Sequence, residues 1–150
     1  MCAICDGTTV DEARLDLANR KQRFGWALQG VEASRPWVYT IGLVERFDHP
    51  ELVMAGVPIP VAGSALNALG ARIAEGERFP PGCSGVRVHE VEVVTGVVHH
   101  VHVAAGLVGQ WEDHYRDDPA MLQRLEVVQV LPVPIGRLPR LDRSYTTLDI

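Results

Sequence analysis

Short apolar runs rich in valine, isoleucine and aromatic residues alternate along the chain with turns rich in glycine and proline. Runs of this length and composition are typical of β-strands. They predict strands at residues 24–31, 37–43, 51–56, 86–94, 97–103 and 125–131. The turn-like segment between the first two runs predicts a hairpin. Apolar residues on both faces of the third run predict a central strand.

Helical spacing of apolar residues marks three further segments. They predict a helix over about 11–22 that Thr8 or Thr9 caps, a helix over about 62–75 that stops at Gly76, and a short amphipathic helix through Leu107, Trp111 and Tyr115. The order of elements predicts one α+β domain spanning residues 1–150. We expect a mainly antiparallel twisted sheet of about six strands, two or three packed helices, and an irregular Pro-rich tail from about residue 132.

The composition is that of an ordinary globular protein, because 47% of the 150 residues are hydrophobic and 22% are charged. A net charge of −5 disfavours a nucleic-acid surface, which normally needs clustered Lys and Arg. No apolar stretch reaches the roughly 18 residues that span a bilayer, and the first residues lack the pattern of a signal peptide. We therefore expect a cytoplasmic protein that contacts neither nucleic acid nor a membrane, with its cysteines reduced.

The two valine-rich runs flank Thr95-Gly96, a tight-turn signal, and therefore predict a hairpin. Counting outward from that turn, with side chains alternating along each strand, places His89, His100 and His102 on one face. Three imidazoles on a rigid ribbon can hold zinc with one coordination position open. The alternative is a half-exposed hairpin whose polar face is rich in histidine.

Cys2 and Cys5 form a C-x-x-C pair, which is half of a structural zinc site or a redox pair. No second C-x-x-C follows, although Cys83 and a histidine could complete the ligand set in the folded chain. The alternative is that both are ordinary small apolar residues near the beginning of the chain. The cysteine and histidine patterns suggest zinc as a cofactor, and the cofactor is otherwise left open.

Asp48, His49 and Glu51 lie on a polar loop between two strand-like runs. A loop on a rigid scaffold is a common place for functional groups. His49 and Glu51 could act as a general acid–base pair in catalysis, or as a pair of metal ligands. Alternatively, the two carboxylates satisfy backbone donors around the loop and His49 is solvated.

Several blocks of the chain resemble a bacterial family called domain of unknown function 4262, over about residues 1–139. The two most specific blocks are Tyr39-Thr40-Ile41-Gly42-Leu43 and His49-Pro50-Glu51-Leu52. The resemblance implies the extent of the domain and brings no reaction with it. The tail departs from the family pattern, because residues 132–140 lack the Asp and the Trp that members usually carry there.

The first of these blocks makes Tyr39, Thr40 and Gly42 candidate ligand contacts. Since Tyr39 and Thr40 face opposite sides of a strand, only one of them can reach a given pocket. Residues 37–56 also faintly resemble the strand–loop–strand of the flavin-reductase split barrel, a fold-level analogy only.

Three functions compete on this basis. The leading hypothesis is an accessory or sensory protein that binds a small molecule or a metal. The first alternative is a zinc-dependent enzyme in which His49 and Glu51 form the acid–base pair. The second is an interaction module that binds a protein partner or forms a homo-oligomer, since exposed valine-rich strand edges can pair with another chain.

Overall fold

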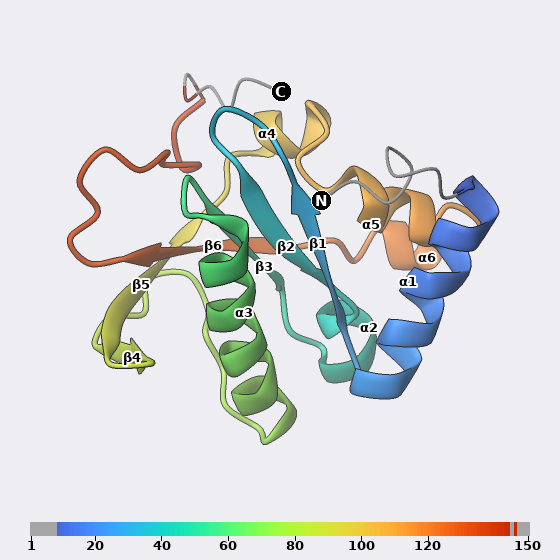
Figure 1. Cartoon of the computed structure of the whole chain (residues 1–150), viewed down its shortest axis with the longest axis horizontal. Helices are drawn as coiled ribbons and strands as arrows, with labels where there is room; N and C mark the ends of the chain where they lie inside the picture. Colours follow the sequence, from blue (N-terminus) through green and yellow to red (C-terminus); the bar gives the residue numbers. More distant parts are fainter. Residues whose placement is uncertain (1–8, 145, 147–150) are drawn as a thin grey trace.

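The computed structural model describes residues 9–144 and 146. Within that part of the chain, six helices and six strands follow one another (Figure 1). In chain order they are α1 (Val10–Phe24), β1 (Ala27–Val31), β2 (Trp37–Ile41), α2 (Leu43–Phe47), β3 (Glu51–Ala55), α3 (Ile59–Ala74), β4 (Val86–Val88), β5 (Val91–Val97), α4 (His100–Ala104), α5 (Gly109–His114), α6 (Pro119–Leu122) and β6 (Val127–Pro132).

All six strands form one sheet in the order β1-β2-β3-β6-β5-β4. The α+β class and the number of strands are confirmed. The sheet is mixed and not purely antiparallel, because β3 and β6 run parallel, with Glu51 opposite Val127. Six helices in the described residues, against the two or three predicted, correct the sequence analysis further. The three helices that were not predicted, α2, α4 and α6, have only four or five residues, too few to show helical periodicity.

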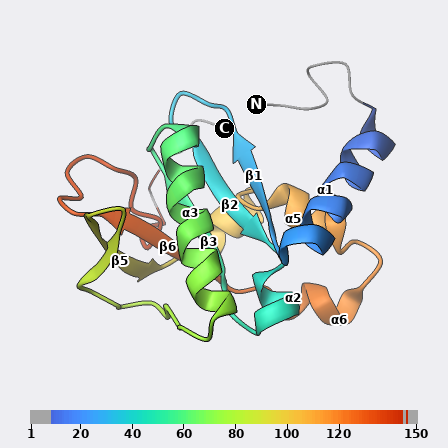
Figure 2. The ribbon, with the colours of Figure 1, turned by 60° about the horizontal axis from the view of Figure 1, so that its bottom comes forward.

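Two hydrophobic clusters lie on the two faces of the sheet. On one face, α3 packs against β2 and β3 through residues such as Leu66 and Leu69. On the other face, residues from α1, α5 and α6 pack around Trp37 and Trp111. Figure 2 shows α3 in front of the sheet and α5 behind it. Because β3 is buried on both faces and lies between β2 and β6, its predicted central position is confirmed.

The predicted long helices form close to their expected ends. The Thr9 hydroxyl accepts a hydrogen bond from the Glu12 backbone N–H and so caps α1. The second long helix, α3, begins three residues earlier than predicted, because Pro60 occupies a first-turn position where its missing N–H is not needed. The hairpin of β1 and β2 is also confirmed, with Leu28 opposite Thr40.

The predicted hairpin at Thr95-Gly96 is wrong. Both residues lie inside β5, where Thr95 pairs with Val130 and Gly96 with Gln129 of β6. The hydroxyl of Thr95 donates to the Pro80 carbonyl and accepts from the Cys83 N–H, so it fixes a neighbouring loop and makes no turn. The actual turn falls earlier, between β4 and β5, and the second valine-rich run continues into α4.

None of the helices in the described ranges is long and apolar enough to cross a membrane.

Candidate functional site

The Glu51 carboxylate is the best-connected polar group in the core. Its side chain lies at the start of β3 and is completely buried. Five donors reach its two oxygens over distances of 2.7–3.2 Å. They are the Thr40 hydroxyl, the backbone N–H groups of Gly42, Leu43 and Val44, and the Trp111 indole Nε1–H. This one side chain therefore ties together β2, α2, β3 and α5.

The local backbone explains why three N–H groups converge on one carboxylate. Gly42 precedes the first residue of α2 with a φ of 124°, so consecutive N–H groups at the helix N-terminus point the same way. Only glycine fits there, since an added Cβ would lie 2.8 Å from the Gly25 carbonyl oxygen. Glu51 supplies the acceptor that these otherwise unpaired donors require.

The donor set around Glu51 fits its ionised form. Burial raises the pKa of the Glu51 carboxyl, and the hydrogen bonds from Thr40, Trp111 and the backbone act against that rise. Four of the five partners are N–H groups, which can only donate. A protonated Glu51 could donate only to Thr40, whose hydroxyl proton would then lose its acceptor.

His49 has a defined tautomer and no free ring nitrogen. Its Nε2 accepts a hydrogen bond of 2.9 Å from the Phe79 backbone N–H, so the ring proton must be on Nδ1, which donates to the Pro50 carbonyl at 2.8 Å. The imidazole is buried, and burial lowers its pKa. The ring therefore links the residue before β3 to the loop that follows α3.

The sequence-predicted residues thus come together in part. Thr40 and Gly42 both contact Glu51. Tyr39 points to the opposite face, where its hydroxyl accepts a hydrogen bond from the Gln110 N–H and burial raises its pKa. Their roles in catalysis and ligand binding stay predictions. Their contacts favour the structural alternative, because each polar atom already has a partner inside the fold.

An open pocket of about 720 Å³ lies directly beside this network. Its wall includes Pro50, which stands between His49 and Glu51, and Glu126, whose carbonyl accepts the Glu51 backbone N–H at 2.8 Å. Most of the lining is aliphatic. The full lining is Pro50, Pro81, Val97, Val98, His100, Val103, Ala104, Leu125, Glu126, Val127 and Val128.

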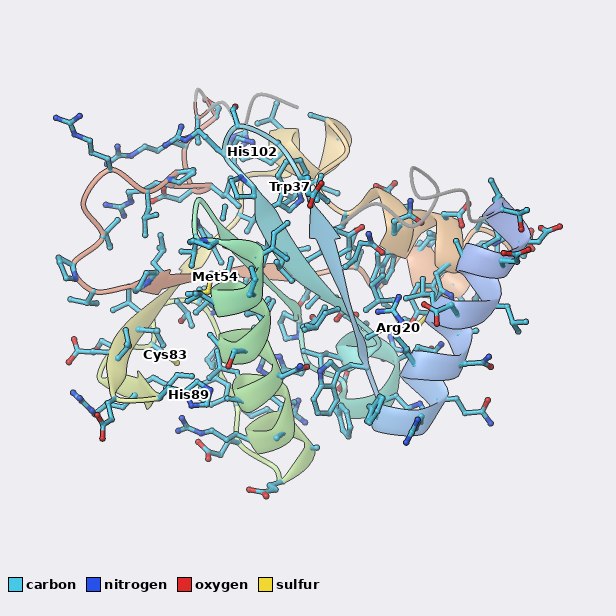
Figure 3. All side chains as sticks on the ribbon, viewed as in Figure 1. Arg20, Trp37, Met54, Cys83, His89 and His102 are labelled. Carbon is cyan, nitrogen blue, oxygen red and sulfur yellow. The ribbon has the colours of Figure 1, made fainter. Side chains whose placement is uncertain are left out.

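The predicted histidine cluster does not form, because the hairpin that would create it is absent. His89 lies in the turn between β4 and β5, whereas His100 and His102 are on α4. Figure 3 shows His102 near the top of the view and His89 well below it, on the other side of the sheet strands between them. The His102 ring donates through Nε2 to the Arg143 carbonyl at 2.7 Å, and His100 stacks on His99.

No group of three or more potential ligands that could hold a metal occurs in residues 9–144 and 146. The Cys2 and Cys5 prediction lies outside the described residues and stays a prediction. Cys83 is a free thiol, partly buried on the loop before β4.

Sequence reasoning missed two important residues. The helical spacing placed Trp111 on the apolar side of a short amphipathic helix, and it gave no sign that the indole N–H binds Glu51 across 60 positions of the chain. Glu126 gave no signal at all, since a single acidic residue near the start of a predicted strand is common. The one available hint was the position of Glu51 itself, an acid at the start of an otherwise apolar central strand.

Comparison with known proteins gives one match. Residues 21–142 match the family model of DUF4262, a domain of unknown function. Neither the curated proteins nor the solved structures provide a match to the chain.

Proposed function

This chain belongs to the DUF4262 family, as its sequence motifs indicated, and we propose that it is a small-molecule-binding domain whose ligand site is the pocket beside Glu51. The Glu51 and His49 contacts serve as the scaffold that holds one wall of this pocket in place. The observation that carries the proposal is the pocket itself: an aliphatic cavity with two ionisable side chains on its wall.

The size and lining of the pocket support this function. Its volume of about 720 Å³ lies within the range of 300–1,000 Å³ that is typical of sites for drug-sized ligands. Such sites are mostly apolar and carry a few polar groups that orient the ligand. Here those groups are the carboxylate of Glu126 and the imidazole of His100.

The carboxylate of Glu126 favours a ligand that carries a positive charge or a hydrogen-bond donor. This carboxylate forms no ion pair or side-chain hydrogen bond within the described residues, unlike the fully engaged Glu51. An apolar molecule with an amine or another hydrogen-bond donor would complement this wall. The exposed position of Glu126 limits the gain from a charge pair to about two- to fivefold in affinity.

The alternative of a zinc-dependent enzyme with His49 and Glu51 as acid–base pair is less well supported. A general base must reach the proton that it removes, and Glu51 is completely enclosed while both His49 nitrogens are bonded to backbone. The pocket touches Pro50 between them but neither of their side chains.

A fluorescence titration with Nile red, an uncharged apolar dye, tests the proposal. Ala104→Trp places an indole in the pocket from an exposed position of α4, and Ala105→Trp is the matched control on the adjacent exposed residue, which does not line the pocket. We expect saturable binding with blue-shifted emission in the wild type and in Ala105→Trp, and at least tenfold weaker binding in Ala104→Trp.

The charge preference is tested with octylammonium and octanol as competitors for the dye. Octylammonium should compete better than octanol in the wild type, and Glu126→Gln should make the two equal. Absence of saturable dye binding, or equal binding by the two tryptophan variants, would refute the pocket as the ligand site.

A further inference from the structure

A second cavity lies between α3 and the β4–β5 end of the sheet. This groove has a volume of about 620 Å³. Aliphatic side chains from several elements line it, among them Met54 of β3, Val61 of α3 and Val91 of β5. Figure 3 shows Met54 and His89 on the same side of α3. None of the groove residues belongs to the pocket beside Glu51.

Ser64 and His89 are the two polar side chains in the lining of this groove. The Ser64 Oγ and His89 Nε2 atoms are 3.2 Å apart, so the hydroxyl and the ring share a hydrogen bond from α3 to the β4–β5 turn. Both residues are exposed, so a ligand in the groove can reach them. No carboxylate lines the groove, in contrast to the pocket that contains Glu126.

The backbone that carries His89 is strained. His89 and Glu90 form a two-residue turn between the paired Val88 and Val91, with φ values of 48° and 68°. Two consecutive positive φ angles are typical of the hairpin turn that strongly prefers Asn-Gly. A residue with a side chain is disfavoured in this conformation. Such strain often persists where a side chain must be held at a functional position.

We propose that the groove binds an apolar carboxylate, such as a medium-chain fatty acid, with its head group on Ser64 and His89. On binding, the hydrogen bond between these two residues gives way, so that the Ser64 hydroxyl and the His89 Nε2–H each donate to one oxygen of the carboxylate. The hydrocarbon chain then lies along the aliphatic wall formed by α3 and the strands. The strained turn is retained because it places the imidazole beside Ser64 at the edge of the groove.

The hydrocarbon wall predicts a dependence on chain length. Each methylene group that the groove removes from water should tighten binding about fourfold. Affinity should therefore rise from hexanoate to octanoate and level off once the chain outgrows the groove. Octanol, which lacks the second oxygen and the charge, should bind at least several-fold more weakly than octanoate.

Isothermal titration with octanoate tests the head-group site. Ser64→Ala and His89→Ala should each weaken binding about tenfold, because each removes one donor to a charged acceptor. Ser84→Ala is the matched control, an exposed serine outside the groove. Ala104→Trp, which fills the other pocket, should leave octanoate binding unchanged. A loss of octanoate binding in Ala104→Trp would place octanoate in the pocket beside Glu51. That result would overturn the groove proposal and leave the proposed function of the pocket standing.

The double variant His89→Asn/Glu90→Gly tests whether the strain is kept for binding. It installs the residues that this turn prefers and removes the imidazole. We expect its melting temperature to rise by about 4–8 °C, while octanoate binding falls as far as in His89→Ala. Full octanoate binding by the double variant, or no octanoate binding by the wild type, would overturn the proposal. Light scattering provides a further test. If the mass in solution is twice that of one chain and octanoate does not change it, a second copy of the chain occupies the groove, and the proposal is overturned.

Discussion

Replacing Glu51 by glutamine removes one oxygen acceptor and the negative charge while keeping the shape of the side chain. The best orientation of the amide keeps its oxygen at the Oε2 position, where the N–H groups of Gly42, Val44 and Trp111 donate. The amide NH₂ then replaces Oε1, which accepts from Leu43 and Thr40. The hydroxyl of Thr40 can turn and accept, but the Leu43 N–H is left facing another donor.

The cost follows from these contacts. An unpaired buried N–H costs about 1–3 kcal/mol, and each of the three retained hydrogen bonds loses roughly 1 kcal/mol of charge assistance. Part of this loss is offset because burying an ion costs several kcal/mol, which the neutral amide avoids. We therefore expect Glu51→Gln to lower the free energy of unfolding by about 2–3 kcal/mol. For a domain of this size, that corresponds to a melting temperature lower by about 5–10 °C.

Thermal unfolding at pH 7.5, followed by circular dichroism, measures this effect. Glu75→Gln is the matched control, because Glu75 is exposed at the end of α3 and its carboxylate has no partner within the described residues. The control should melt within about 1 °C of the wild type. A Glu51→Gln variant as stable as the wild type, or more stable, would show that the carboxyl is neutral in the fold and would refute the donor-set argument.

Three further predictions concern the same network. Trp111→Phe should lower the free energy of unfolding in urea by about 2–3 kcal/mol, because its indole donates to the Glu51 carboxylate. Trp37→Phe should cost less, because the Trp37 indole donates to a neutral carbonyl. Equal losses in the two variants would contradict the charge assigned to Glu51. Gly42→Ala should lower the free energy of unfolding by at least about 2 kcal/mol, because of the φ of 124° and the contact of the added Cβ with the Gly25 carbonyl. An unchanged urea midpoint would contradict this backbone conformation at Gly42. Because burial lowers the pKa of His49 in the folded state, unfolding takes up protons, so the free energy of unfolding should fall as the pH drops below about 6.5. His49→Gln should reduce the slope of the free energy of unfolding against pH between pH 7.5 and 5.5. The part of the slope that remains comes from His114, whose pKa is also lowered by burial. An unaltered slope would exclude a buried neutral His49.

Local patterns predicted the parts of the fold that depend on nearby residues. The β1–β2 hairpin, the two long helices and the central strand all follow from short-range periodicity and capping. Thr40 and Gly42 were predicted as ligand contacts, and Glu51 was predicted as part of an acid–base pair. The three form one cluster, because β2 and β3 are adjacent antiparallel strands joined by a short helix.

The rest depended on contacts between distant positions. Nothing near Glu51 in the sequence reveals that β6 pairs with β3 or that Trp111 reaches the carboxylate. The turn at His89-Glu90 has neither Asn nor Gly, so it gave no signal, whereas Thr95-Gly96 gave a false one. Thr95 and Gly96 instead pair with Val130 and Gln129 of β6, and no local pattern reveals that pairing.

Valine methyl NMR tests the central claim, that the pocket beside Glu51 takes an apolar ligand, most directly. The chain has valines at both cavities, so one spectrum reports on each. Nile red should shift the methyl signals of the pocket valines and leave those of the groove unchanged. The pocket set is Val97, Val98, Val103, Val127 and Val128, and the groove set is Val57, Val61, Val88, Val91 and Val93. Shifts confined to the groove set, or no shifts at saturating dye, would contradict the account.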